Sequence, residues 1–364
     1  MSISKAILSL ILFLSSIHIQ SIDYKKIEKH VENTPQSITK STTALSKYLT
    51  DPFDKEDERF AAIYFWIGKN IKYDVSQRNS NRKYFSTKEF INEVMKYKKG
   101  VCQHYSELFK ELSILAGLES HVISGYGKTD GNISGLAHAW NAIKVNENWY
   151  FVDATWGAGY VSHGIYKYDF RLKYFMVKPE KFVEDHMPFD PMWQLLKFPF
   201  KYEEFDLGTK KSTHHNEFFY EDSIKNYLKL PEIEQIQARI RRIDSNGKKN
   251  ILVKNEIKQE KTYLSISVKN IDIGNINSGN YLFNTALKQY NDFYDNIGSN
   301  YKPVKHKELP ELYDIEKKIQ QAKQYYAKVK TNDPQIVQKL KQAKSAVKSL
   351  ENIVNKRKKI LMNN

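Results

Sequence analysis

The stretch Gly100-Val101-Cys102-Gln103-His104-Tyr105 contains the single cysteine of this 364-residue chain and stands directly before a strongly helical run. The run 103–116 predicts a helix, because its leucines recur at the spacing of one apolar face and a glycine follows it. These residues are Leu108, Leu112, Leu115 and Gly117. Cys102 would then lie at the first turn, where unpaired backbone N–H groups and the helix dipole favour an anion. Because the thiolate is the nucleophilic form of cysteine, this position predicts a reactive thiol.

A histidine and an aspartate follow in two strand-like segments, 138–145 and 149–155, with turn residues between them. Together the segments predict a β-hairpin. A two-residue turn at Asn146-Glu147 would place Asp153 opposite Trp140 and diagonal to His138. A three-residue turn without a bulge would instead put His138 and Asp153 on opposite faces of the sheet.

A thiol, an imidazole and a carboxylate in this order are the parts of a nucleophile, a base and a group that orients the base. On this interpretation they are Cys102, His138 and Asp153. His104 is closer to the cysteine in sequence, but residues two apart do not share a helix face. His104 is therefore rejected as the base.

Three motifs in this order resemble the transglutaminase-like domain family of the papain-like cysteine superfamily. They are Gly100-Val101-Cys102-(x)2-Tyr105, His138-Ala139-Trp140-Asn141 and Trp149-(x)3-Asp153-x-Thr155-Trp156-Gly157. The upstream segments 61–67 and 70–74 resemble the kyphoscoliosis-peptidase-like bacterial branch of that family. The resemblance covers residues 24–200.

The resemblance implies an α+β fold with a papain-like core, in which a cysteine at a helix N-terminus packs on an antiparallel sheet. It implies Cys102 as nucleophile, His138 as general base and acid, and Asp153 as the group that orients His138. Tyr73, Trp140 and Trp156 would line the substrate site, although packing in the core accounts for them equally well.

The chain departs from the family at the oxyanion site. Val101 stands where animal transglutaminases have a glutamine, and Lys96 stands at the papain-type glutamine position. This difference weakens the case for cross-linking and favours hydrolysis of peptide, isopeptide or carboxamide bonds through a thioacyl intermediate. The alternative is a catalytically retired domain that serves as a protein-binding or envelope-binding scaffold.

Other chemistries have little support in the sequence. The chain contains no GxxxxGK[ST], HExxH or paired CxxC motif. Residues 131–135 miss the GxSxG motif by one position and read as a flexible loop before His138. His214 and His215 are adjacent, which is not the spacing of metal ligands on a helix. No metal and no cofactor is therefore predicted.

The N-terminus reads as a secretory signal peptide over residues 1–21. Lys5 precedes an apolar run at 6–14, and Ile19-Gln20-Ser21 is suitable for cleavage. We therefore expect a secreted protein or one of the periplasm or cell envelope, with an uncleaved N-terminal anchor as the alternative. A single cysteine excludes an intramolecular disulfide, and an unpaired thiol in an oxidising compartment adds weak support for a working Cys102.

The chain is basic, with a net charge of +15, and much of this charge lies near its end. Residues 302–364 hold sixteen Lys or Arg against six Asp or Glu. The expected partners are a protein or peptide substrate and, for this basic segment, an anionic cell-envelope polymer. The plainer interpretation of the segment is a solvated lysine-rich helix face. No nucleic-acid-binding signature is present, so nucleic acid is not expected.

Four segments are predicted: the signal peptide at 1–21, the catalytic domain at 22–200, a helix-rich region at 201–300 and a basic helical hairpin at 301–364. Within them we expect an acidic loop at 51–58, a helix at 60–71, strand and loop at 171–200, and helices at 217–230 and 231–243. Residues 251–268 are ambiguous between strand and helix. The hairpin has apolar residues at steps of three and four, with Asp333 as N-cap and Pro334 at the first helical position. Its apolar seam comprises Leu312, Ile315, Ile319, Ala322, Tyr326, Val329, Ile336, Leu340, Ala343, Val347, Leu350 and Val354.

Overall fold

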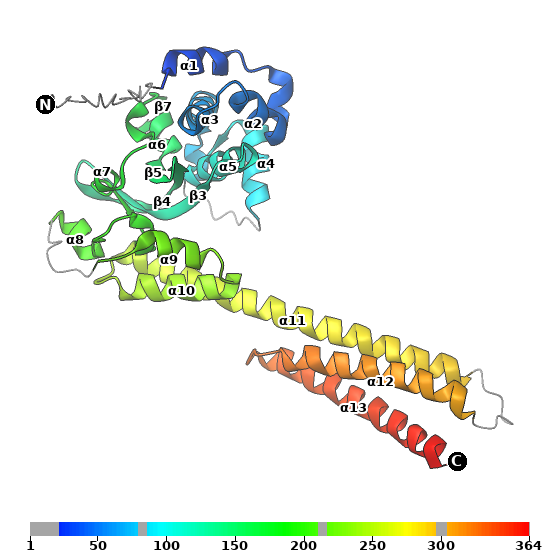
Figure 1. Ribbon diagram of the computed structural model, residues 1–364. Coiled ribbons are helices and arrows are strands. Elements are labelled where there is room, and N and C mark those ends of the chain that lie inside the picture. Colours follow the sequence, from blue (N-terminus) through cyan, green and yellow to red (C-terminus); the bar gives the residue numbers. More distant parts are fainter. Residues whose placement is uncertain (1–21, 79–85, 210–216, 296–303, 364) are drawn as a thin grey trace, which may run out of the picture. The chain divides into compact units, whose positions relative to one another are not determined.

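A computed structural model describes residues 22–78, 86–209, 217–295 and 304–363 of the chain (Figure 1). It divides the chain into two compact units, Met1–Tyr220 and Glu221–Asn364. The change in sequence character at residue 201 falls inside the first unit. The signal peptide at 1–21 and the pair His214-His215 lie outside the described residues, so those assignments stay predictions.

Helices make up much of the first unit. Its α-helices are α1 (Tyr24–Glu32), α2 (Thr42–Thr50), α3 (Glu56–Asn70), α4 (Thr87–Tyr97), α5 (Cys102–Leu115), α6 (Ala154–Ala158), α7 (Pro179–Phe182) and α8 (Tyr202–Leu207). Short 3₁₀ turns are η1 (Gln36–Lys40), η2 (Val75–Gln77), η3 (Leu172–Tyr174) and η4 (Pro191–Gln194). The acidic loop expected at 51–58 is shorter than predicted, because its last acidic residues form the first turn of α3, where they complement the helix dipole.

The main sheet of the first unit is antiparallel and has the strand order β5-β4-β3-β8. Its strands are β3 (Ser120–Thr129), β4 (Asn132–Val145), β5 (Asn148–Val152) and β8 (His186–Pro188). Two small sheets accompany it, the parallel pair β1 (Lys72–Tyr73) with β2 (Lys99–Gly100) and the antiparallel pair β6 (Gly159–Ser162) with β7 (Ile165–Tyr168). The fold is therefore α+β, as expected. The predicted flexible loop at 131–135 is wrong, since β4 begins at Asn132 and pairs with β3.

The hairpin turn between β4 and β5 has two residues, the first of the two alternatives considered above. Val145 pairs with Asn148, and both Asn146 and Glu147 have positive φ angles, of 47° and 65°. Two residues with positive φ form a type I′ turn, which matches the twist of the strands on either side. The pairing continues to Asn141 opposite Val152. This is the register that a two-residue turn implies.

Helix α3 forms the centre of the core. Each residue from Phe60 to Gly68 is buried, so this helix is enclosed on all sides. Tyr64 donates a hydrogen bond of 2.5 Å to the carbonyl of Arg171. A Cβ placed on Gly157 would lie 1.8 Å from the Tyr64 hydroxyl oxygen, so this position of the Thr155-Trp156-Gly157 motif has room for glycine only.

Helix α5 begins at Cys102 and ends at Leu115, within one residue of the predicted bounds. Leu108 and Leu112 are completely buried, but Leu115 is 42% exposed and does not belong to the core face. Tyr105 and Phe109 supply the remaining buried contacts, because they lie on the same side of the helix as the two leucines. The helix is thus fixed against the core while its N-terminal residue stays half-buried.

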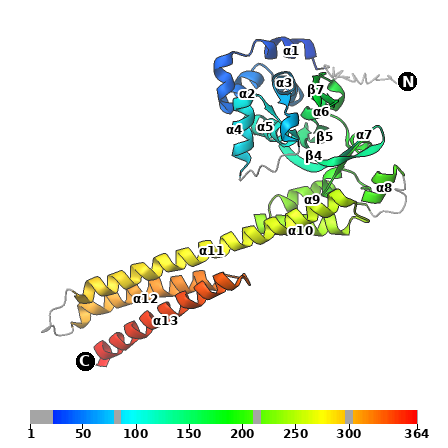
Figure 2. The ribbon, with the colours of Figure 1, turned by 180° about the vertical axis from the view of Figure 1, so that it is seen from behind.

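The second unit is helical throughout its described residues. Its helices are α9 (Tyr220–Tyr227), α10 (Glu232–Ser245), α11 (Ile251–Asp295), α12 (Lys305–Ala327) and α13 (Pro334–Asn363). Residues 251–268, which the sequence left ambiguous, form the first part of the 45-residue helix α11. In both views α11 lies alongside α12, with α13 beyond it (Figures 1 and 2).

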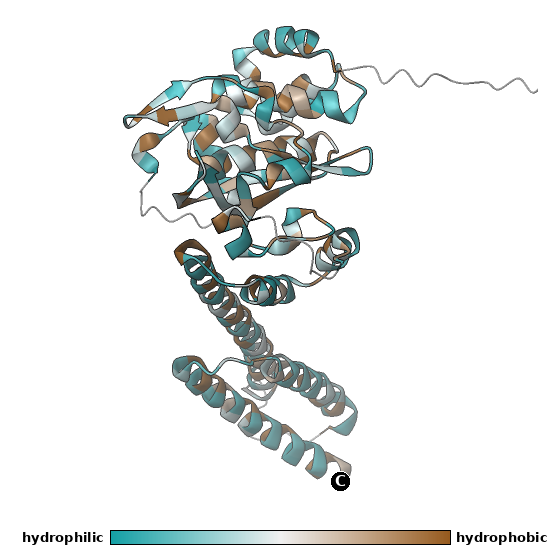
Figure 3. Ribbon diagram, turned by 90° about the vertical axis from the view of Figure 1, so that its left-hand side faces the viewer, coloured by the Kyte–Doolittle hydropathy of each residue, from teal (hydrophilic) through white to brown (hydrophobic). Residues whose placement is uncertain are grey.

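The apolar seam of α12 and α13 is buried at most of its predicted positions, and Ala286 of α11 belongs to the same cluster. The seam therefore packs α11, α12 and α13 together, whereas the sequence predicts a hairpin of two helices. The hydrophilic faces of these helices lie outside it (Figure 3). Val329 falls beyond the end of α12 and is an exception. Asp333 Oδ1 accepts hydrogen bonds from the backbone of Gln335 and Ile336, which confirms the predicted N-cap.

No helix in the described part of the chain combines the length and the apolar character that a membrane span requires.

Candidate active site

Cys102 is the first residue of α5, and it follows Val101, which has an extended backbone conformation. Nδ1 of His104 accepts a hydrogen bond of 3.2 Å from the backbone N–H of Val101 and so closes this helix start. His104 is completely buried. Its role is to cap the helix, and this agrees with its rejection as the base. The first backbone bond of the helix runs from the N–H of His104 to the carbonyl of Val101, so the N–H groups before it can stabilise negative charge on or near Cys102.

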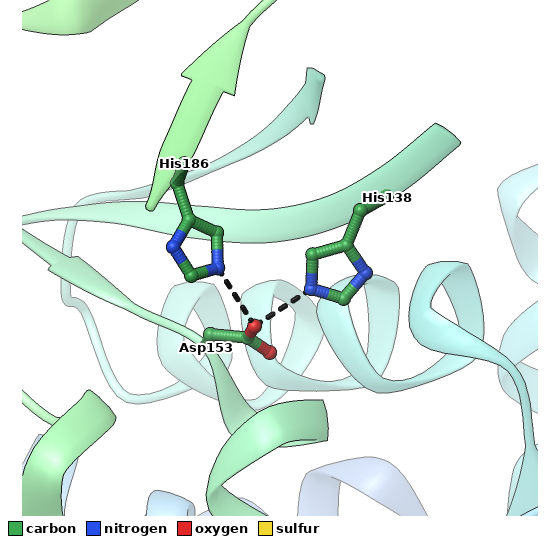
Figure 4. A group of neighbouring side chains, drawn as sticks. All are labelled: His138, Asp153 and His186. Atoms are coloured by element: carbon green, nitrogen blue, oxygen red, sulfur yellow. Dashed lines mark hydrogen bonds and ion pairs between the residues drawn. The ribbon is translucent and has the colours of Figure 1, made fainter. Parts of the chain in front are cut away.

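His138 lies on β4 and connects the thiol with the carboxylate. Its Nε2 lies 2.6 Å from Oδ2 of Asp153 (Figure 4). Burial lowers the pKa of His138, but the charge of Asp153 and hydrogen bonds to Asp153 and Cys102 outweigh burial and raise the pKa to about 10. Since Nε2 is occupied by Asp153, Nδ1 is the ring nitrogen that can exchange a proton with Cys102.

Asp153 is fully buried and is the N-cap of α6. Its Oδ1 accepts hydrogen bonds from the backbone N–H of Thr155 at 2.8 Å and of Trp156 at 3.0 Å. The strand predicted to run to residue 155 ends at Val152 instead, because this capping turn starts a helix. Burial raises the pKa of Asp153, but the charge and hydrogen bond of His138 outweigh burial and hold that pKa well below its usual range. The carboxyl group is therefore an anion that faces an imidazole.

A family model described as the transglutaminase-like superfamily matches residues 43–154, a span that contains Cys102, His138 and Asp153. The chain carries a transglutaminase-like domain. The kyphoscoliosis-peptidase resemblance seen in the sequence is confirmed by similarity to that protein from two mammals.

The similarity to known proteins is partial. The chain is 29% identical over 237 residues to kyphoscoliosis peptidase from Homo sapiens, which is 62% of this chain and 34% of that protein. Identity to the Mus musculus protein is 31% over 218 residues, 57% of this chain and 32% of that one. Hillarin from Drosophila melanogaster is 26% identical over 212 residues, 52% of this chain and 25% of that protein. The chain thus spans about a third of the length of the two kyphoscoliosis peptidases.

Among solved structures, a crystal structure of a TGase aligns with a TM-score of 0.26 at 16% identity. The alignment covers 44% of this chain and 38% of that chain. With this TM-score and identity, the alignment does not support an interpretation of the site.

Sequence reasoning missed one residue of the candidate site, His186 on β8. Its Nε2 lies 3.2 Å from Asp153 Oδ2, and its Nδ1 lies 2.5 Å from Oδ1 of Asp185. Residues 171–200 were read as strand and loop, and the three-residue strand β8 is too short for a clear alternation. The one available signal was a histidine beside an acidic residue within an aromatic-rich segment.

The three aromatic residues expected to line the site have different surroundings. Trp156 is half-buried and stacks on the ring of His138 at 5.2 Å between centroids. Tyr73 is also half-buried; burial and then the charge of Cys102 raise its pKa to about 12. Trp140 has no exposed surface and packs against Phe182, behind His138. Tyr73 and Trp156 are therefore the two that have surface to offer a substrate.

The absence of a side chain at Gly125 of β3 leaves space for the Trp140 indole. A Cβ on Gly125 of β3 would lie 2.3 Å from that ring, so a side chain there would displace it. The indole in turn lies 5.9 Å from the His138 ring, measured between centroids. The sheet thereby supplies a rigid backing for the imidazole.

His138, Asp153 and His186 each offer a metal-ligating atom, and these atoms lie within 4.8 Å of one another. Two ligands of a tetrahedral zinc ion are about 3.3 Å apart, given metal–ligand bonds of about 2.0 Å. The 2.6 Å between His138 and Asp153 is instead the length of a strong, charge-assisted hydrogen bond. The group has the geometry of hydrogen-bonded side chains, and it does not fit a metal as it stands.

Proposed function

We propose that the transglutaminase-like domain is a cysteine enzyme that hydrolyses peptide, isopeptide or side-chain carboxamide bonds through Cys102, His138 and Asp153. The observation that carries the proposal is the 2.6 Å contact between His138 and Asp153, in a histidine whose pKa the single cysteine also helps to raise. A base that is oriented on one side and meets a thiol on the other is the arrangement that nucleophilic catalysis needs.

In the first half-reaction, the Cys102 sulfur forms a bond to the carbonyl carbon, and the π electrons of the carbonyl move onto its oxygen. The backbone N–H at the start of α5 can donate to this oxyanion. When the intermediate collapses, the C–N bond breaks and Nδ1 of His138 gives its proton to the departing amine. The product is a thioester on Cys102, with His138 neutral.

In the second half-reaction, His138 takes a proton from a water molecule while the water oxygen bonds to the thioester carbon. The C–S bond then breaks, which releases a carboxylic acid and restores the thiolate and the imidazolium. A lysine amine in place of water would give an amide instead, so the triad alone does not select the acceptor. Val101, in place of the glutamine of animal transglutaminases, and the peptidase name of the mammalian relatives support hydrolysis.

A direct test uses reduced, denatured casein together with a fluorescent primary amine. Wild-type protein is compared with Cys102→Ser and with His121→Ala, a matched histidine change in β3. His121 contacts Glu119, Trp149 and Trp193 rather than the triad. New peptide N-termini and released ammonia report hydrolysis by mass spectrometry, and fluorescence in the protein band reports amine transfer.

We expect new termini or ammonia with wild type and with His121→Ala, and neither with Cys102→Ser. Amine incorporation without hydrolysis would overturn the hydrolytic assignment in favour of a transferase. Turnover that survives Cys102→Ser would overturn the role of the cysteine. Tight retention of substrate with no chemistry in any variant would favour the retired binding scaffold.

A further inference from the structure

Two imidazoles share one carboxylate oxygen in this site. Oδ2 of Asp153 lies 2.6 Å from Nε2 of His138 and 3.2 Å from Nε2 of His186 (Figure 4). The proposed triad uses the first contact and gives no role to the second. The following inference rests on the proposed function and concerns what His186 adds to it.

His186 is held in place independently of His138. It lies on β8, which pairs with β3, whereas His138 lies on β4. Its side chain has no exposed surface, and its ring stacks on Phe182 at 4.0 Å between centroids. The Trp156 ring lies at 4.4 Å. A side chain packed on this many sides has little rotamer freedom, so it can fix whatever it bonds to.

Asp153 is thereby restrained through both oxygens. The backbone at the start of α6 holds Oδ1, while the two histidines hold Oδ2. If the His186 contact were absent, Oδ2 would keep one donor, His138 itself. The carboxylate could then rotate with the imidazole that it is meant to orient. A second contact from His186 on β8 fixes the orientation of the Asp153 carboxylate independently of His138 on β4.

Asp185 in turn orients the His186 ring. Its Oδ1 lies 2.5 Å from Nδ1 of His186, and its side chain is 30% exposed. The contact with Asp185 limits rotation of the His186 ring, so Nε2 keeps facing Asp153. The contacts run continuously from Asp185 at the surface through His186 and Asp153 to His138.

We propose that His186 is a positioning residue that keeps Oδ2 of Asp153 directed at Nε2 of His138, with Asp185 holding the His186 ring in turn. His186 touches neither the substrate nor the reacting atoms and acts only through Asp153. Its loss should weaken the stabilisation of the His138 imidazolium and so reduce the thiolate that Cys102 presents at acid pH.

The test follows alkylation of Cys102 by iodoacetamide from pH 5 to 10 in wild type, His186→Phe, His186→Gln and His121→Phe, with thermal unfolding measured in parallel. Phenylalanine fills the ring space but donates nothing to Asp153. Glutamine keeps an N–H near the position of Nε2. We expect His186→Phe to alkylate about tenfold more slowly at pH 6, because a hydrogen bond to a charged group is lost. His186→Gln and the control His121→Phe should stay within about twofold of wild type, since each keeps the donor to Asp153.

An unchanged pH profile in His186→Phe, with only the melting temperature lowered, would make His186 a structural residue and overturn the proposal. Faster alkylation at pH 6 would also overturn it, since His186 would then compete with His138 for Asp153. If His186→Phe does not fold, Asp185→Asn and His186→Gln provide the comparison.

Failure of the proposed function is recognised separately, by a wild-type profile that His138→Ala does not change. In that case ¹⁵N NMR titration of the His138 ring still decides the role of His186. We expect the His138 midpoint to fall in His186→Phe, and an unchanged midpoint would contradict the inference.

Discussion

Nε2 of His138 lies 2.6 Å from Oδ2 of Asp153, and this contact spans fifteen residues of chain. The two-residue turn at Asn146-Glu147 produces it, because that turn sets the register of β4 against β5. One extra turn residue would have reversed the face of one partner. The orientation of the His138 imidazole thus depends on the Asn146-Glu147 turn, which lies outside the candidate site.

The charge of Asp153 can be removed with little change in shape. Asp153→Asn keeps an oxygen for the N–H groups of Thr155 and Trp156, so α6 should remain capped. It replaces an anion with a neutral amide beside His138 and favours the wrong tautomer. We expect turnover to fall by about 10³- to 10⁴-fold, with the protein still folded by circular dichroism. Turnover within tenfold of wild type would exclude Asp153 as the orienting group.

Folding stability should decrease as the pH rises above neutrality. The pKa of His138 is raised to about 10 in the folded protein, above the ordinary value of about 6.5. The folded state therefore binds this proton more tightly, so the added stability is complete below about pH 6.5 and is lost as the pH rises towards 10. Thermal unfolding from pH 6 to 10 should show this decline in wild type and a flatter curve in Asp153→Asn. Parallel curves for the two proteins would contradict the pairing.

Acid should have the opposite effect through Asp153. Its pKa is held below the ordinary value of about 4, so this group stabilises the fold above that value. The contribution is lost as the pH falls through the lowered folded pKa. In Asp153→Asn the part of the acid destabilisation that comes from this group should be absent. Urea unfolding at pH 5 and pH 3 measures the difference.

Gly157 lies close to the candidate triad residue Asp153, and it also packs tightly against Tyr64. Gly157→Ala would place a methyl group 1.8 Å from the hydroxyl oxygen of Tyr64 and disturb the bond from that hydroxyl to Arg171. We expect a loss of about 1–3 kcal/mol in unfolding free energy, the usual cost of overpacking a core. Gly135→Ala is the matched control, since a Cβ at Gly135 meets nothing within 4 Å. Equal stability of the two variants would refute this packing.

The second unit has an ion pair that should matter for its own stability only. Glu308 is completely buried and accepts hydrogen bonds from Arg357 at 2.8 Å and Tyr294 at 2.9 Å. Removing one partner of a buried pair leaves an uncompensated charge. The Arg357 side chain is 24% exposed, so solvent screening reduces the expected loss in Arg357→Met to about 1–3 kcal/mol.

Lys323→Met serves as the control for this change. It breaks an exposed pair with Glu351, which should cost about 0–1 kcal/mol. Chemical unfolding of both variants gives the comparison. Cys102 alkylation should be unchanged in both, and a changed alkylation rate in Arg357→Met would show that the two units are coupled.

Much of the site could be predicted from the sequence because its parts have local signals. The helix start at Cys102, the hairpin turn and the order of thiol, imidazole and carboxylate each depend on nearby residues. The position of Asp153 was predicted less accurately. The segment 149–155 has the pattern of a strand, so the turn in which Asp153 caps α6 could not be recognised from it.

The remainder depends on contacts between distant parts of the chain. The sequence did not locate β3 or the position of β8 within 171–200, and it is their pairing that brings His186 to Asp153 across 33 residues. The continuous apolar run of α3 is covered by helices from separate parts of the chain, among them α1, α2 and α5. Residues 263–268 also have β-forming side chains, yet they lie within the continuous helix α11.

The most direct test of the account is the pH dependence of Cys102 alkylation by iodoacetamide in wild type and in His138→Ala, followed at that residue by mass spectrometry. The account predicts that wild type is already reactive well below about pH 8.5, where a free thiol ionises. It predicts that His138→Ala moves this reactivity to higher pH. A wild-type thiol that does not react, or one with the same profile in both proteins, would contradict a thiolate–imidazolium pair and with it the catalytic role of the site.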